Sequence, residues 1–136
     1  MSSLIKFLRA RLDEDQAVAI VASPGPWSVD NTTYPEAIYD ADQATVISGG
    51  RWGGEASIFS LDEDAFHIAR HDPSRVLAEV QAKRAILDEL ERLGHLPLSL
   101  PEDLQYVGAH QALLGAARWL ALPYQDHPDY REEWRP

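Results

Sequence analysis

Apolar residues recur at helical spacing at the start of the chain. The apolar positions on or near one face are Leu4, Ile5, Leu8, Leu12 and Val18. This spacing predicts a helix over residues 3–22. Pro24 prevents the helix from continuing, and the sequence SPGPW at 23–27 predicts a turn.

Short stretches with β-strand character follow this turn. They are WSV at 27–29, AIY at 37–39, ATVIS at 44–48 and ASIF at 56–59. Glycine pairs separate the last two of these stretches. The pattern predicts a small antiparallel sheet of three or four strands with glycine turns.

Two helices are predicted to meet in the middle of the chain. Ser60 is followed three residues later by Glu63, which is a capping-box pattern, and this helix ends one residue before Asp72. Asp72 is then the expected N-cap of a second helix, with Pro73 at its first position and Gly94 at its end. Its apolar stripe contains Val76, Val80, Leu87 and Leu90.

A last long helix is predicted from about Pro101 to Leu122. Ser99 and Glu102 form a second capping-box pattern at its start. One side of this helix carries Leu104, Val107, Leu114 and Ala121, and close contacts with other helices are permitted by Gly108 and Gly115. Because a short connection at 95–101 precedes it, we expect it to pair antiparallel with the helix at 73–93.

These elements predict an α+β fold: an N-terminal helix, a small antiparallel sheet, and a helical pair or bundle packed on it. We expect one domain at 1–122 and an aromatic, acidic tail at 123–136. A homodimer is a plausible assembly, because long apolar helices often continue their packing between subunits.

The composition excludes several classes of protein. The chain of 136 residues contains no Cys, so it can form no disulfide, cysteine zinc site or thiol nucleophile. Its net charge of −10 disfavours direct binding to nucleic acid. We find no signal peptide and no apolar run long enough for a membrane helix, and we therefore expect a cytoplasmic protein without a membrane partner.

One pattern is compatible with a metal site. His67 and His71 are four residues apart on one helical face, and Glu63 lies one turn before them. Two histidines and a carboxylate can bind zinc, but no residue in the sequence is fixed as a further ligand. The alternative is a helix corner, in which His71 contacts the carbonyl groups of the last helical turn. We favour the corner and expect no cofactor, with zinc as the alternative.

No catalytic motif is found, but two segments carry candidate binding residues. Arg51 and Trp52 lie between two glycine pairs, where a hairpin tip could present them to a partner. The tail contributes Tyr124, Tyr130 and Trp134. These tail aromatics either dock on a partner or fold back onto the protein's own core.

Three separated motifs resemble a family of small uncharacterised proteins from actinobacteria and their phages. The motifs are FLRARLDEDQAVA with SPGPW, then HIARHDPSRVLAEVQAKRAILDE, then LALPYQDHPDYREEWRP. The resemblance implies no activity. It implies a structural metal in relatives that carry a cysteine pair before LALPY, but this chain has an alanine-rich helix there and no Cys.

Taken together, these features favour an uncharacterised, non-enzymatic protein-binding or adaptor protein. Its protein partner is unidentified, and we expect an association with phages or prophages. A metal-dependent enzyme using His67, His71 and Glu63 is the first alternative. The second is an acidic decoy that imitates nucleic acid, which the charge of −10 would suit.

Overall fold

The computed structural model confirms the predicted α+β fold. It describes residues 2–30, 32–34, 37–48, 62–97 and 99–136. The chain forms two compact units: unit 1 is Met1–Glu14 with Val80–Pro136, and unit 2 is Asp15–Glu79. Among the described residues, no helix is both long enough and apolar enough to cross a membrane.

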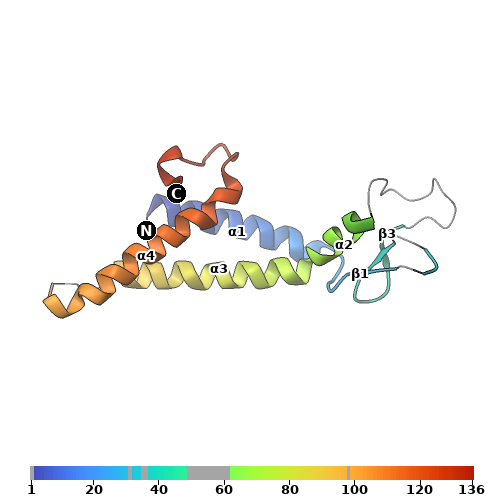
Figure 1. Cartoon of the computed structure of the whole chain (residues 1–136), viewed down its shortest axis with the longest axis horizontal. Coiled ribbons are helices and arrows are strands. Elements are labelled where there is room, and N and C mark those ends of the chain that lie inside the picture. The colour runs from blue at the N-terminus through green and yellow to red at the C-terminus, as the bar shows by residue number, and fades with distance from the viewer. Residues whose placement is uncertain (1, 31, 35–36, 49–61, 98) are drawn as a thin grey trace. The chain divides into compact units, whose positions relative to one another are not determined.

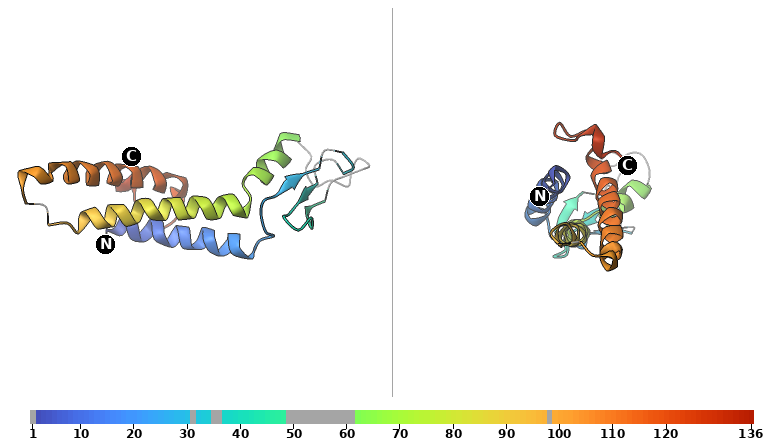
Figure 2. Two further views of the ribbon diagram at one scale, coloured as in Figure 1. Left: turned by 90° about the horizontal axis from the view of Figure 1, so that it is seen from below. Right: turned by 90° about the vertical axis from the view of Figure 1, so that its left-hand side faces the viewer.

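Unit 1 is built from three helices. They are the first part of α1 (Ser3–Val21), the second part of α3 (Pro73–Gly94) and α4 (Leu104–Ala121). Figures 1 and 2 show α4 returning along α3 in the opposite direction, which is the antiparallel pair expected from the short connection. The core of unit 1 contains Leu4, Leu8, Leu12, Leu87, Leu90, Leu93, Ala117 and Ala121. The apolar periodicity of α1 and α3 therefore predicted the buried side of both helices in this unit.

Charged pairs join α1 to α3 at the edge of this core. Arg9 Nη2 lies 2.8 Å from both Asp88 Oδ1 and Glu91 Oε2, and Arg84 Nη2 lies 2.6 Å from Asp13 Oδ1. The hydrogen bond to Asp88 raises the pKa of Arg9 above its ordinary value. Pairs that are this exposed contribute little stability each, so the apolar core is the main attachment between the two helices.

The start of α4 differs from the prediction. A 3₁₀ turn, η1 (Pro101–Asp103), precedes the α-helix. The Asp103 carboxylate, not Glu102, accepts hydrogen bonds from the backbone N–H groups of Ser99 and Leu100, at 3.0 and 2.9 Å. The Ser99–Glu102 capping box was therefore wrong, because the 3₁₀ turn moves the start of the α-helix three residues along the chain.

The apolar side predicted for α4 was also partly wrong. Leu104 is 71% exposed and Val107 is 41% exposed, whereas Ala117 and Ala121 are buried. Val18 of α1 departs from its prediction in the same way, with 69% of its surface exposed. Small alanines, rather than the larger residues at the start of α4, form its contact with the core.

The described residues of unit 2 form a three-stranded antiparallel sheet in the order β1-β2-β3. The strands are β1 (Ser28–Val29), β2 (Ile38–Tyr39) and β3 (Thr45–Ile47). The predicted strand at 56–59 lies outside the described residues. Helix α2 (Asp62–Arg70) places Ala65 and Ala69 against the buried Ile38 of the central strand. This cluster is the core of unit 2.

The corner before α3 formed as predicted, with one addition. Asp72 is the N-cap, and its Oδ1 accepts a hydrogen bond of 2.9 Å from the Arg75 backbone N–H. Its Oδ2 accepts a second bond of 2.8 Å from the Trp27 backbone N–H, which attaches the SPGPW turn to the helix start. Gly25 fits here because a Cβ at this position would lie 2.9 Å from the Ser74 backbone nitrogen.

Asp30 organises the loop between β1 and β2. Its Oδ1 accepts hydrogen bonds from the backbone N–H groups of Thr32 and Thr33, at 2.8 and 3.2 Å. These bonds, the one from Thr32 first, hold the pKa of the Asp30 carboxyl below its ordinary value. A lowered folded-state pKa means that this stabilisation is present above the unfolded-state pKa and is lost as the pH falls through the folded-state value.

We therefore expect Asp30→Ala to be less stable than the wild type at neutral pH and to approach it in acid. The difference should shrink as the pH drops below about 3.9, the ordinary range of an aspartate. Urea unfolding of both proteins at several pH values measures it. A difference that does not change with pH would contradict this role of the carboxylate.

Candidate binding groove on helix α1

The C-terminal segment, residues 123–136, packs on helix α1 through a cluster of aromatic rings. Phe7 of α1 is at its centre, with ring centroids 5.0 Å from Trp134, 6.0 Å from Tyr130 and 6.3 Å from Tyr124. Phe7 and Trp134 are both buried. Edge-to-face and tilted rings at these distances add attraction to the apolar area that they bury. Of the two interpretations of the tail, the structure shows the one in which the aromatics fold back.

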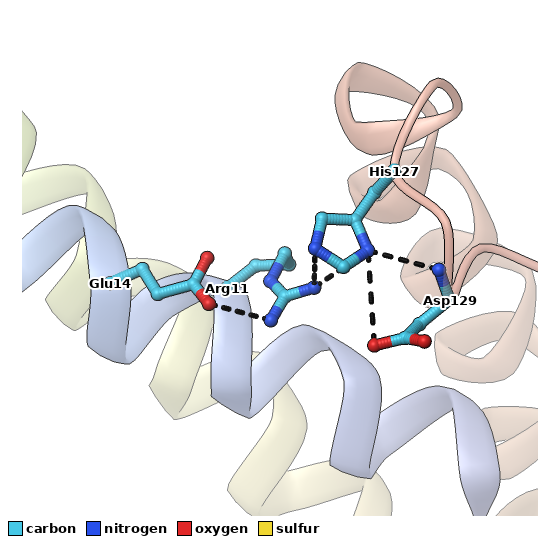
Figure 3. Close-up of polar contacts among 4 residues, drawn as sticks. All are labelled: Arg11, Glu14, His127 and Asp129. Carbon is cyan, nitrogen blue, oxygen red and sulfur yellow. Dashed lines mark hydrogen bonds and ion pairs between the residues drawn. The ribbon is translucent and has the colours of Figure 1, made fainter.

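Arg11 makes the polar part of the same attachment (Figure 3). It is 7% exposed, and its Nη2 lies 2.7 Å from Glu14 Oε1. Its Nη1 faces the ring of His127, with Nδ1 at 2.8 Å and Nε2 also within hydrogen-bonding distance. Since a guanidinium can only donate, a ring nitrogen of His127 is the acceptor. His127 Nδ1 also accepts a bond of 3.1 Å from the Asp129 backbone N–H.

An open groove of about 530 Å³ lies between α1 and this segment. The side chains that give it its character are Lys6, Phe7 and Arg11 of α1 and Tyr130, Arg131 and Trp134 of the C-terminal segment. Its volume falls within the range of sites that hold small molecules or parts of larger ones.

The groove is positively charged although the chain is strongly acidic. Lys6, Arg11 and Arg131 line it, opposed within the lining by Asp129 alone. Two buried polar atoms here, Arg11 Nε and the Tyr130 hydroxyl, have no hydrogen-bond partner within the described part of the chain. Cations beside aromatic surface are suited to binding an anionic group attached to an apolar one.

Comparison with protein families gives one result. A model described as a family of unknown function (DUF6221) matches residues 1–136. The chain belongs to this family. Neither a curated protein nor a solved structure matches it. Membership in DUF6221 confirms the predicted resemblance to an uncharacterised family, while an origin in actinobacteria or their phages stays a prediction.

The structure of this DUF6221 protein brings together only some of the predicted binding residues. Tyr130 and Trp134 line the groove, and Tyr124 contacts Phe7 outside the lining. Arg51 and Trp52 lie outside the described residues. A role in partner binding stays a prediction for all five residues.

His67, His71 and Glu63 are exposed on α2 and the corner that follows it. The two histidine rings are 4.4 Å apart, and His71 Nδ1 donates a hydrogen bond of 2.8 Å to the His67 carbonyl oxygen. This is the contact expected of a histidine in the last turn of a helix. In the described ranges of the DUF6221 chain, no three His, Asp or Glu residues are grouped so that they could hold a metal ion.

The part of the groove that α1 contributes was not predicted from the sequence. Lys6, Phe7 and Arg11 belong to the expected helix but not to its leucine stripe. The available signal was the spacing of Phe7 and Arg11, four residues apart, which puts an aromatic ring and a cation on one side of the helix. That signal does not show that residues more than a hundred positions later pack against them.

Proposed function

We propose that this DUF6221 protein is a non-enzymatic protein-binding or adaptor protein, and that its groove on α1 holds an acidic segment of a partner protein. The observation that carries this proposal is the positive lining of the groove in a chain of net charge −10. The resemblance adds a phage- or prophage-associated setting for such a partner.

The charges in the groove favour a carboxylate-bearing occupant. Arg11 is already paired with Glu14, which leaves Lys6 and Arg131 to attract the ligand. Lys6 is exposed and has no ion pair among the described residues. Arg131 is 3.5 Å from Glu133 and its side chain is 58% exposed, so it too can reach a ligand at modest cost.

The aromatic rings favour an occupant with an apolar or aromatic side chain beside its carboxylates. Arg131 Cζ lies 5.5 Å from the centre of the Trp134 ring, which forms a cation–π pair at the wall of the groove. Trp, Tyr and Arg are the residue types that contribute most to protein interfaces. An extended peptide with an aromatic residue between acidic residues therefore matches the groove in charge and in surface.

Selection from an unbiased peptide library on the full-length protein tests the proposal. We expect enriched peptides to carry Asp or Glu next to an aromatic or large apolar residue. The strongest peptide, made synthetically, should bind about tenfold more weakly to Lys6→Glu and to Arg131→Glu. Its binding should also weaken as the salt concentration rises.

Arg70→Glu is the matched control, because it makes the same change in net charge on an exposed residue of α2. This variant should bind the peptide within about twofold of the wild type, because Arg70 is not among the residues that line the groove. An equal loss in all three variants, enrichment of basic peptides, or no enrichment at all would each contradict the proposal.

A further inference from the structure

Helix α4 carries an exposed apolar face that no described residue of unit 1 covers. Leu104 is 71% exposed, Trp119 is 63% exposed and Val107 is 41% exposed. The helix contains one formally charged residue, Arg118, and no carboxylate. In a chain in which a quarter of the residues are charged, this composition distinguishes α4 from α1 and α3.

The two glycines of α4 serve no packing contact within the described part of the chain. A Cβ added at Gly108 or at Gly115 would meet no atom within 4 Å. A glycine inside a helix costs about 1 kcal/mol relative to alanine. Their small size therefore has no use in the folded chain itself, although they had been expected to permit close helix contacts.

The exposed face is symmetric along the helix. Residues 104, 108, 111, 112, 115 and 119 follow one another at spacings of three and four, with 111 and 112 adjacent at the centre, so they lie on one side. About the midpoint between Gln111 and Ala112, Gly108 corresponds to Gly115 and Leu104 corresponds to Trp119. The side chains on this face are thus small near its centre and large at both ends, in whichever direction the helix runs.

We infer that this face binds the same face of a second copy, with the two α4 helices antiparallel about a twofold axis near residues 111 and 112. A twofold interface must be self-complementary, and a symmetric face meets that requirement. The two glycines would let the helices approach closely at the centre, while Trp119 packs on Leu104 of the partner subunit.

Charge permits a second copy to bind at this face, whereas it opposes contact between the acidic surfaces of two copies. Each copy carries −10, so contacts through acidic surfaces are repulsive. Pairing through α4 adds no carboxylate to the interface. A helix pair covers less than the roughly 800 Å² per partner of a standard interface, and we expect a dissociation constant on the order of 10 µM.

The inference does not rest on the proposed function, because the groove lies on α1 and the C-terminal segment. The first test is sedimentation of the full chain at concentrations between about 1 and 200 µM. This range extends to both sides of the expected dissociation constant of the dimer. The wild type should change from monomer to dimer. The variants Gly108→Leu and Gly115→Leu should stay monomeric. Their monomers should be at least as stable as the wild-type monomer. Leucine favours a helix more than glycine does, and a Cβ at either position meets no atom within 4 Å. Gln81→Leu, an exposed position on α3, is the control and should dimerise normally.

Cysteine cross-linking tests the geometry, since the natural chain has no Cys. Gln111→Cys should form a disulfide dimer on its own, because it lies at the twofold axis. Leu104→Cys alone should not, but a mixture of Leu104→Cys with Trp119→Cys should form the mixed dimer. A wild type that stays monomeric at about 200 µM, or Gly108→Leu and Gly115→Leu variants that dimerise as well as the wild type, would overturn the inference. Efficient cross-linking of Leu104→Cys to itself would overturn the antiparallel arrangement.

Discussion

Replacing Trp134 with alanine is expected to lower the free energy of unfolding of the chain by about 3–5 kcal/mol, the usual cost of truncating a buried aromatic residue to alanine. Trp134 is 6% exposed although it is residue 134 of 136. Its ring contacts Phe7 and Tyr130, so the substitution removes apolar area and two aromatic pairs at once. The C-terminal segment would keep its polar contact at Arg11 but lose most of its apolar attachment.

Trp119→Ala is the matched control, because the same side chain is removed from a position that is 63% exposed. At protein concentrations below those at which copies associate, it should change stability by less than about 0.5 kcal/mol. Urea unfolding followed by circular dichroism measures both variants. If Trp134→Ala lowers the free energy of unfolding as little as Trp119→Ala does, the packing of the C-terminal segment contributes no stability to unit 1.

The sequence predicted the elements whose cause is local. The leucines of α1 and α3 are periodic, and the same periodicity buries them in the structure. The corner at Asp72 and Pro73 follows from residue preferences at helix starts, which act over a few positions. Local signals of this kind do not depend on which other element covers the helix.

Helix α4 shows where such signals fail. Its residues are apolar on most sides, so periodicity cannot tell which side faces the core. The buried side proved to be that of Ala117 and Ala121, while Leu104 and Trp119 are exposed. Burial here is decided by how closely α4 approaches its neighbours, which is a property of the assembled bundle.

The groove depends on contacts between distant parts of the chain. His127 and Arg11 are 116 positions apart, and neither belongs to a motif with a fixed spacing. The sequence identified Tyr130 and Trp134 as unusual residues for an acidic tail, but not the surface that they meet. Phe7 completes that surface and could not be separated from an ordinary core residue of an amphipathic helix.

Replacing Asp72 with alanine is expected to lower the free energy of unfolding by about 2–4 kcal/mol, combining the loss of an N-cap with an unpaired, partly buried N–H group. Asp72 is 7% exposed and accepts bonds from Trp27 and Arg75 through different oxygens. Asn has one acceptor oxygen in its amide. Asp72→Asn should therefore keep one of the two bonds and lose about half as much stability as the alanine variant.

Asp42→Ala provides the control, because it removes an exposed carboxylate from the same unit and should cost less than about 0.5 kcal/mol. Hydrogen exchange separates the two functions of Asp72. The Trp27 amide should exchange much faster in Asp72→Ala than in the wild type, because its acceptor is gone and the SPGPW turn is no longer attached to α3. If helix α3 frays at its start while the Trp27 amide stays protected, Asp72 acts as a helix cap only, and another contact holds the turn in place.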